Sequence, residues 1–281
     1  MKAPETVIGQ QEALNLIELT SPAQHLLLTG PPGIGKTHIA MWYAGNLLGA
    51  WCEPINGTRA DDYMPLMTQA KAAIIIDECH MMAKPEALYP LLDAPIETGV
   101  DEDGDEYTKI FILATTDEGE LPPALRSRLL TVALRPYTMD ELAQISQLNE
   151  PTLRHDTALS LSQYSKGSPR RVKRLSQIVA NIEKKYGLQL KPSHIPGTLK
   201  AIGQPNGLTL REVEFMRALK DGSLSKSSLM GVLGMGSDTV RMIETDLMGI
   251  KLLKIGYRGR SLTPSGQVAL WEVEKVLSKG E

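Results

Sequence analysis

The stretch that decides the fold is Gly30-Pro31-Pro32-Gly33-Ile34-Gly35-Lys36-Thr37. It matches the pattern G-x-x-x-x-G-K-[S/T], and it lies between a strand-like run, His25–Thr29, and a helix-like stretch, Thr37–Leu48. Glycines at positions 33 and 35 let main-chain N–H groups converge on phosphate oxygens, and the helix N-terminus adds positive potential. We therefore expect Lys36 to reach the β- and γ-phosphates of a nucleotide and the Thr37 hydroxyl to bind Mg²⁺.

A second apolar run, Lys71–Ile76, ends in two carboxylates about 40 residues beyond the phosphate loop. We expect the first, Asp77, to hold Mg²⁺ directly or through water, and the second, Glu78, to orient and polarise the attacking water. His80 follows closely, and its position fits a structural or capping role as well as a catalytic one.

A third run, Lys109–Ala114, ends in Thr115 and Thr116. A hydroxyl at that strand tip, beside the acidic strand, can contact water or the γ-phosphate, and we assign this role to Thr116; the alternative is two threonines that merely end a strand. Short apolar runs separated by helical patterns predict an α/β core in which helices flank a parallel sheet. This core is expected over residues 1–136.

Beyond Pro136 the pattern becomes helical, which predicts a small helical lid domain over 137–190. The proline and glycine content of 191–206 predicts a linker. Residues 207–281 read as three short helices and then two strands around Gly256-Tyr257-Arg258-Gly259-Arg260, which is typical of a winged helix. The expected elements are helices at Met139–Leu148, His155–Lys166, Pro169–Lys185, Thr209–Lys220, Ser225–Leu233 and Asp238–Met248, and strands at Lys251–Ile255 and Ser261–Thr263.

The composition excludes several classes of protein. No apolar run approaches the ~18 residues of a transmembrane helix, and Met1–Glu5 lacks the apolar core of a signal peptide. Two cysteines, Cys52 and Cys79, cannot build a disulfide framework or a four-thiolate zinc site, so we expect a cytoplasmic protein. Residues 1–136 hold 9 Lys and Arg against 19 Asp and Glu, whereas 137–206 hold 10 against 5. If the protein binds nucleic acid, this charge distribution therefore favours a surface in the part of the chain after residue 136; the alternative is unrelated solvated faces.

Together these motifs resemble the AAA+ ATPases and, within them, the RuvB family of branch-migration motors. The resemblance covers nearly the whole chain. Asp77-Glu78-Cys79-His80 is similar to the acidic box of that family, and Val7-Ile8-Gly9-Gln10 is similar to the segment that lies over adenine. It implies an ATP-hydrolysing motor that acts on branched or forked DNA in recombination or replication, a homo-oligomeric ring of hexameric type, and ATP with Mg²⁺ as cofactors.

The resemblance also implies site residues. Arg128, preferred to Arg126, is similar to an arginine finger supplied to a neighbouring subunit, and Arg170 is similar to the second sensor of the γ-phosphate. The ATP-binding residues are Val7, Ile8, Gly30, Pro31, Pro32, Gly33, Ile34, Gly35, Lys36, Thr37 and His38. The expected DNA contacts are Arg241, Lys251, Lys254, Arg258 and Arg260, and Arg171, Lys173 and Arg174 are expected on a solvated face or a lid contact.

Two segments depart from this family. Phe111–Asp117 is more similar to a bacterial clamp-loader ATPase, and Gly99–Lys109 is shorter than the hairpin that docks the family's junction-binding partner. The acids around Gly104 (Asp101, Glu102, Asp103, Asp105 and Glu106) do not fit an apolar docking hook.

These departures keep other functions open. The alternatives are a clamp-loader or helicase-loader switch that remodels a protein ring, with a replication protein as its partner, and an ATP-regulated DNA-binding adaptor. The winged helix has a protein-interaction module as its own alternative. A third alternative, a helicase of the DExH type suggested by Asp77-Glu78-Cys79-His80, is disfavoured, because such enzymes need two large domains of one kind and this chain has room for one.

Overall fold

The structure, a computed structural model, describes residues 6–49, 53–101 and 104–278. It divides into two compact units, Met1–Arg135 and Pro136–Glu281, and each is described by itself. Predictions that concern Met1–Glu5, Cys52, Glu102 and Asp103 lie outside the described residues. Within the described part, no helix is long and apolar enough to cross a membrane.

A five-stranded parallel sheet, in the order β2-β3-β6-β1-β7, forms the centre of the first unit. The three central strands are the three apolar runs of the sequence, so the prediction of buried parallel strands is confirmed. The strands are β1 (Leu26–Thr29), β2 (Ile55–Asn56), β3 (Ile74–Asp77), β6 (Phe111–Thr115) and β7 (Leu130–Ala133).

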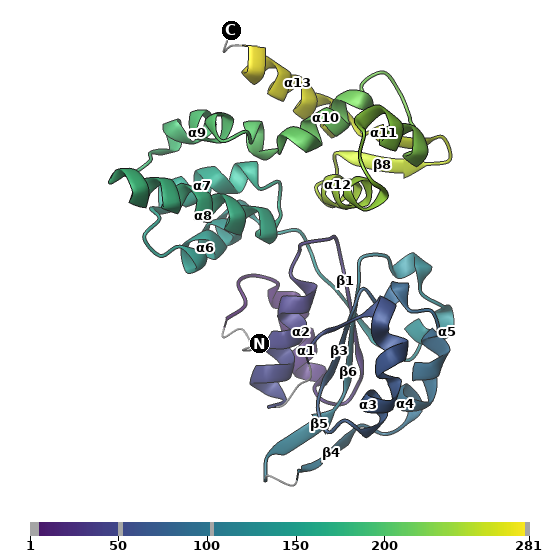
Figure 1. Cartoon of the computed structure of the whole chain (residues 1–281). Helices are drawn as coiled ribbons and strands as arrows, with labels where there is room; N and C mark the ends of the chain where they lie inside the picture. The colour runs from purple at the N-terminus through teal and green to yellow at the C-terminus, as the bar shows by residue number, and fades with distance from the viewer. Residues whose placement is uncertain (1–5, 50–52, 102–103, 279–281) are drawn as a thin grey trace. The chain divides into compact units, whose positions relative to one another are not determined.

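Helices cover both faces of this sheet. Figure 1 shows α1 (Gln11–Thr20) and α2 (Lys36–Leu47) on one side, and the shorter helices α3, α4 and α5 on the other. Because successive side chains of a strand alternate between faces, both faces of each central strand must be apolar, and every residue of β1 and β6 is buried. The shorter helices are α3 (Met64–Gln69), α4 (Tyr89–Asp93) and α5 (Pro123–Arg126).

A separate antiparallel hairpin, β4 (Glu97–Val100) and β5 (Glu106–Lys109), projects from this unit (Figure 1). Its described tip is acidic, and the Asp101 main chain and carboxylate both bind Asp105. The resemblance implied a short hairpin over Gly99–Lys109, and a hairpin is present there, whereas the edge strands β2 and β7 were not expected. Their short alternating patterns carry little apolar signal, because one face of an edge strand meets solvent.

The second unit begins with three helices that pack on one another: α6 (Met139–Asn149), α7 (His155–Tyr164) and α8 (Pro169–Tyr186). These helices confirm the helical prediction for this segment. Thr138 is the N-cap of α6 and forms a reciprocal capping box with Glu141. The Gly187 backbone ends α8 in a left-handed conformation that glycine adopts without strain.

The predicted linker, 191–206, contains a helix instead. α9 (Ile195–Ala201) lies within it, and its residues Ile195 and Leu199 are completely buried. Two apolar residues four apart lie on one face of a helix, and burying that face stabilises a segment that proline and glycine content alone assigns to a loop. The prediction of a boundary or linker over 191–206 did not include this helix.

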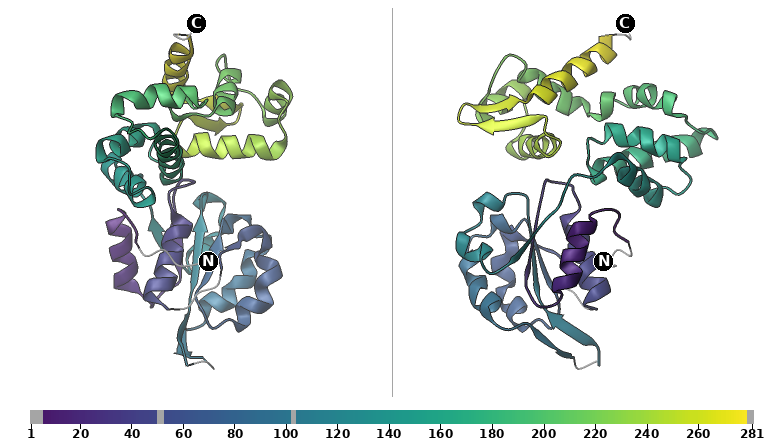
Figure 2. Two further views of the ribbon diagram at one scale, coloured as in Figure 1. Left: turned by 60° about the vertical axis from the view of Figure 1, so that its left-hand side comes forward. Right: turned by 180° about the vertical axis from the view of Figure 1, so that it is seen from behind.

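The rest of the second unit surrounds a core of its own, which includes Phe215, Val240, Leu247 and Leu270. The expected helices and hairpin are present, followed by a final helix that the sequence analysis did not include. Figure 2 shows the hairpin at the side of this group. The elements are α10 (Leu210–Ala218), α11 (Lys226–Leu233), α12 (Ser237–Gly249), β8 (Leu253–Gly256), β9 (Gly259–Leu262) and α13 (Pro264–Ser278).

Candidate nucleotide site

The phosphate loop joins the carboxyl end of β1 to the first residue of α2. Three of its glycines have positive φ angles, 148° at Gly30, 74° at Gly33 and 101° at Gly35. A side chain would be strained at each of these positions, and a Cβ on Gly30 would also lie 3.2 Å from the Leu134 carbonyl oxygen. The glycines therefore allow the loop to curl with its main-chain N–H groups at the start of a helix, as an anion site requires.

The Lys36 side chain lies inside this loop and is only 5% exposed. Its ammonium group donates hydrogen bonds to the carbonyl oxygens of Gly30 at 2.8 Å and Pro31 at 3.1 Å. A cation held by loop carbonyl oxygens fits a bound phosphate, because a phosphate oxygen can take the place of a loop carbonyl. The donor set of the loop thus fits a nucleotide.

The residues expected at the metal ion are in direct contact. The Thr37 hydroxyl donates to Asp77 Oδ2 at 2.6 Å, although the two residues come from different elements, α2 and β3. Hydroxyl and carboxylate oxygens are the ligands that Mg²⁺ prefers. Among the residues that the structure describes, no cluster of three His, Cys, Asp or Glu side chains is arranged for a metal. A Mg²⁺ ion held here would therefore need phosphate oxygens and water to complete its shell.

Glu78 is held by the neighbouring strand tip. Its Oε2 accepts hydrogen bonds from the Thr116 hydroxyl at 2.8 Å and from the Thr116 main-chain N–H at 3.3 Å. The structure therefore brings Thr116, rather than Thr115, to this carboxylate. The sequence order hides this contact, which arises because β3 and β6 are neighbours in the sheet.

A glycine that sequence reasoning missed shapes this corner. The Glu78 backbone is left-handed, with φ of 50°, and a Cβ on Gly57 would lie 2.3 Å from the Glu78 carbonyl oxygen. Only glycine allows so close an approach. The strand β2 that precedes Gly57 thus buttresses the acidic pair.

His80 touches the same carboxylate. Its Nδ1 atom lies 3.4 Å from Glu78 Oε2 and 3.0 Å from the Thr115 hydroxyl, which also accepts from the Asp117 N–H. Sequence reasoning left the role of this histidine undecided, and the structure places it at the edge of the site. Cys79 lies between them and is buried. Burial, followed by the charges of Glu78 and Asp77, raises the pKa of its thiol to about 12, so it does not supply a thiolate nucleophile.

The segment before α1 contacts Arg135, which follows β7, and His38 of α2. Gln10 is buried and exchanges two hydrogen bonds with the main chain of Arg135, at 2.6 and 3.1 Å. The His38 ring lies 3.2 Å from the Thr6 carbonyl oxygen. Val7 and Ile8, between these two anchors, are half-buried. The structure thus brings the expected adenine-side residues close to the start of α2.

The comparisons with known proteins agree with this geometry. Residues 26–137 match the model of the ATPase family associated with various cellular activities (AAA). This segment is an AAA domain.

Solved structures extend the likeness beyond the AAA domain. The RuvB Holliday junction branch migration motor of Thermotoga maritima is 24% identical, with a TM-score of 0.77, over 96% of this chain and 98% of that one. A variant of the same RuvB matches at 23% identity and a TM-score of 0.76, over 94% and 95%. Domain III of the T. maritima replication initiation protein DnaA is 17% identical, with a TM-score of 0.50, over 71% and 95%. At these identities the likeness shows a shared fold.

In the AAA domain, Arg128 lies at the amino ends of the strands, opposite to the ends that carry the phosphate loop. The phosphate loop follows the carboxyl end of β1, whereas Arg128 precedes β7, whose first residue, Leu130, pairs with Leu26 at the amino end of β1. Four strand residues span about 13 Å. Arg128 therefore does not belong to the phosphate site of its own chain.

The Arg128 guanidinium is already held by three partners, one of which is the Ala124 carbonyl oxygen, which accepts from Nη1 at 2.6 Å. Its Nε and Nη2 atoms donate to the two carboxylate oxygens of Asp93 at 2.8 and 3.0 Å, and it lies over the Tyr89 ring at 4.6 Å. The side chain remains 27% exposed. Arg126, the alternative, has a buried Nε with no partner, and its Nη1 lies 3.9 Å from Glu118.

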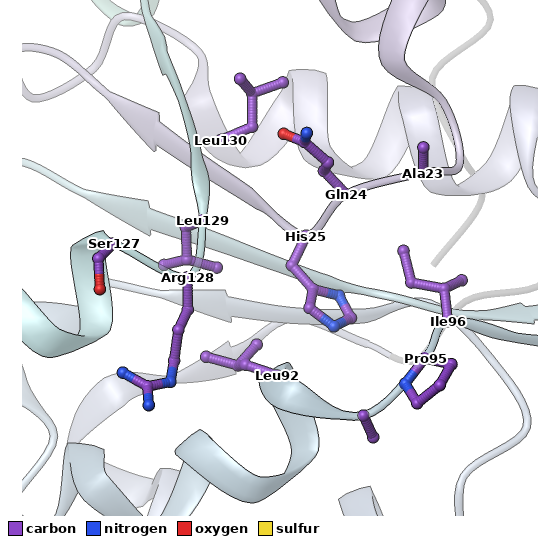
Figure 3. Close-up of a pocket in the computed structure, with 11 residues that line it drawn as sticks. Ala23, Gln24, His25, Leu92, Pro95, Ile96, Ser127, Arg128, Leu129 and Leu130 are labelled. Atoms are coloured by element: carbon purple, nitrogen blue, oxygen red, sulfur yellow. The ribbon is translucent and has the colours of Figure 1, made fainter.

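Arg128 also lines a pocket of about 310 Å³ at this edge of the sheet. Figure 3 shows the His25 ring between Leu92 and Ile96. The Arg128 side chain lies on the far side of Leu92 from this ring. The His25 Nδ1 accepts the Phe111 main-chain N–H at 3.1 Å, and burial lowers the pKa of the ring. The pocket is lined by Ala23, Gln24, His25, Leu92, Ala94, Pro95, Ile96, Ser127, Arg128, Leu129 and Leu130.

In the second unit, the residues after the Gly167-Ser168-Pro169 turn have different environments. Arg170 is exposed at the start of α8, as a ligand sensor must be. Arg171, Lys173 and Arg174 were expected on a solvated face or at a lid contact. The solvated face is wrong for Arg171, which is 7% exposed and forms an ion pair with the similarly buried Glu212 of α10. The helical periodicity explains this, because position 171 lies on the same face as the core residue Leu175.

The cations expected to contact DNA also differ in their exposure to solvent. Arg241, Lys251, Lys254 and Arg258 are exposed. The Arg260 guanidinium instead donates to Glu244 at 2.7 Å, and the Glu244 side chain is 7% exposed. The assignment of Arg260 as a DNA contact is therefore corrected: this residue joins the hairpin to α12.

Proposed function

We propose that this chain is an ATP-hydrolysing, oligomeric motor that acts on DNA, with branch migration or strand separation as its reaction. The observation that carries the proposal is the convergence of Lys36, the Thr37–Asp77 contact and the Thr116–Glu78 contact at the carboxyl ends of three strands. This arrangement contains a cation that can bind phosphate, two oxygen ligands for Mg²⁺ and a carboxylate that can orient water. Each part is needed for phosphoryl transfer to water.

The mechanism assigns one task to each residue. The main chain of the loop and Lys36 bind the β- and γ-phosphates, while Thr37 and Asp77 hold Mg²⁺. When bound, Mg²⁺ neutralises charge on the phosphate oxygens. Glu78 accepts a hydrogen bond from the attacking water and orients it toward the γ-phosphate. Thr116 fixes the Glu78 carboxylate by its 2.8 Å hydrogen bond.

The catalytic site is completed by a neighbouring subunit. Arg128 lies at the sheet edge opposite to the phosphate loop, so its guanidinium serves the nucleotide of the next copy in a ring. There it stabilises charge that develops on the γ-phosphate, a contribution of about 10³–10⁵ in rate for arginines of this kind. Arg128 must exchange its Asp93 partner for phosphate to do so.

The second unit supplies the lid and the DNA contacts. Residues 137–190 form the helical lid, from which the exposed Arg170 senses the γ-phosphate. Residues 207–281 form a winged helix whose exposed cations, Arg241, Lys251, Lys254 and Arg258, contact DNA phosphates. α12 itself carries Asp238, Glu244 and Asp246, so we expect backbone contact in place of base-specific readout.

A mixing experiment tests the shared site. Arg128→Ala protein should bind ATP and hydrolyse it at least 10³-fold more slowly, and Lys36→Ala protein should not bind ATP. Mixtures of the two should regain turnover, because one interface then pairs an intact loop with an intact arginine. Turnover is measured across mixing ratios, with oligomer size followed by light scattering. Arg126→Ala, treated in parallel, should keep full turnover. Normal hydrolysis by a monomer, or by Arg128→Ala alone, would refute the shared site.

The acidic hairpin β4–β5 favours one second candidate, a switch that loads or remodels a protein ring. Asp101, Asp105 and Glu106 offer a negative surface in place of an apolar hook. ATP hydrolysis is measured with forked, four-way and linear DNA, and separately with a sliding clamp or a replicative helicase. Stimulation by DNA together with strand displacement supports the motor. Stimulation by the protein ring alone supports the loader.

A further inference from the structure

The tip of the β8–β9 hairpin presents an aromatic ring to solvent. Only Tyr257 and Arg258 lie between the two strands, and the Tyr257 side chain is 93% exposed. No other large apolar or aromatic side chain among the described residues is exposed to this degree. A ring that is left almost wholly in water gains nothing from folding, which points to a contact outside the chain.

The base of this hairpin is firmly anchored. Arg260 binds the buried Glu244 of α12, and its main-chain N–H and carbonyl exchange hydrogen bonds with Leu224 at 2.8 and 3.0 Å. Gly259, with φ of 105°, passes so close to Leu224 that a Cβ would lie 2.3 Å from its carbonyl oxygen. The hairpin main chain is therefore held in place, so a ligand that contacts the ring meets a tip whose backbone is preorganised.

The charges around the tip indicate which kind of ligand it can bind. No Asp or Glu occurs between residues 247 and 271, whereas Lys251, Lys254 and Arg258 are exposed cations. The Arg258 guanidinium lies 5.2 Å from the centre of the Tyr257 ring. An aromatic platform among cations fits a planar base joined to a phosphate chain. An apolar protein surface would instead desolvate these cations without pairing them.

We propose that Tyr257 stacks on an unpaired base of DNA, at a fork or a single-stranded end, while Arg258 and Lys254 contact the adjoining phosphates. Bases inside a duplex have no free face for the ring, so the contact distinguishes opened strands from intact duplex. The proposal rests on the proposed DNA-binding function and adds the structure of the DNA that the hairpin selects.

The test compares variants on two DNAs of equal length, a fork with 2-aminopurine as its first unpaired base and a blunt duplex. Tyr257→Ala should weaken binding to the fork by roughly 5- to 150-fold, leave binding to the blunt duplex unchanged and abolish the quenching of 2-aminopurine. Tyr257→Trp should retain both properties. Arg258→Ala should weaken binding to both DNAs and lower the salt dependence by about one contact, whereas Tyr257→Ala should not change that slope.

Tyr186→Ala is the matched control, because Tyr186 is also exposed and lies beside a lysine ammonium, at the end of α8 and away from the hairpin. It should bind both DNAs as the natural protein does. Two results would overturn the stacking proposal alone: fork binding that survives in Tyr257→Ala, or an equal loss on the blunt duplex. If the natural protein binds neither DNA, the proposed function fails as well.

Discussion

The hydroxyl of Thr116 lies 2.8 Å from Oε2 of Glu78, although 38 residues separate the two in sequence. The residue after β3 and the residue after β6 are thereby joined by two hydrogen bonds at the phosphate site, one from the hydroxyl and one from the main-chain N–H of Thr116. A donor that holds a carboxylate in this way fixes which oxygen is left for water. The contact joins the acidic strand to the neighbouring strand tip, so a change on one strand must affect the chemistry on the other.

The first prediction concerns Glu78. Glu78→Gln should bind ATP with unchanged affinity, because no charge on the phosphate loop is altered, and should hydrolyse it about 10²- to 10⁴-fold more slowly. Single-turnover hydrolysis and fluorescent-nucleotide binding measure the two effects. Glu86→Gln is the control, because Glu86 is an exposed carboxylate in the segment that follows β3, and this variant should behave as the natural protein. Hydrolysis at the normal rate in Glu78→Gln would contradict the role of this residue in orienting water.

The second prediction concerns Thr116. Thr116→Val keeps the volume of the side chain and removes the hydroxyl donor, so turnover should fall by about 10- to 150-fold, the effect of one hydrogen bond to a charged group. Thr116→Ser keeps the hydroxyl donor and should retain the turnover of the natural protein. Both proteins are assayed for kcat at saturating ATP, where a change in nucleotide affinity does not contribute. If Thr116→Val and Thr116→Ser lose the same activity, the hydroxyl is not the group that matters.

The third prediction concerns the buried ion pair between Arg171 and Glu212. Removing one partner of such a pair leaves an uncompensated buried charge and costs about 3–5 kcal/mol. Arg171→Met should therefore lower the free energy of unfolding of the second unit by that amount, measured by urea denaturation and circular dichroism. Lys173→Met, on the exposed face of the same helix, should have no effect. Equal stability of the two variants would show that the pair is not structural.

The fourth prediction concerns His25 and pH. Burial lowers the pKa of the folded-state ring below the ordinary value of 6.5, so the unfolded chain takes up a proton that the folded chain does not. Stability is then complete above pH ~6.5 and falls as the pH drops below it, by at most about 1.4 kcal/mol per pH unit. His25→Asn should flatten this dependence, because an amide oxygen can still accept the Phe111 N–H. Urea denaturation between pH 7.5 and 5.5 measures it, with His155→Asn, an exposed histidine, as control.

Most of the nucleotide site could be predicted from local sequence. The loop from Gly30 to Thr37 and the acids at 77 and 78 are contiguous patterns, because backbone conformation and phosphate contact depend on residues that are neighbours in the chain. The three apolar runs predicted the central strands for a similar reason: a strand buried on both faces must be apolar throughout.

Other features depend on partners that are distant in sequence. The chain pattern does not distinguish the buried Arg171 from the exposed Arg170, or Arg260 from Arg258, because the deciding carboxylates, Glu212 and Glu244, lie on other helices. Likewise the helix α9 forms within a segment rich in proline and glycine, since burial of Ile195 and Leu199 outweighs local preference.

The sequence by itself determined the phosphate loop, the acidic pair and the order of helices and strands. Only the tertiary structure decided that Thr116 meets Glu78, that Arg128 lies at the sheet edge away from its own phosphate loop, and which cations stay in solvent. The reason is physical: a motif is set by backbone geometry over a few residues, whereas the environment of a charged side chain depends on which strands and helices the core brings beside it.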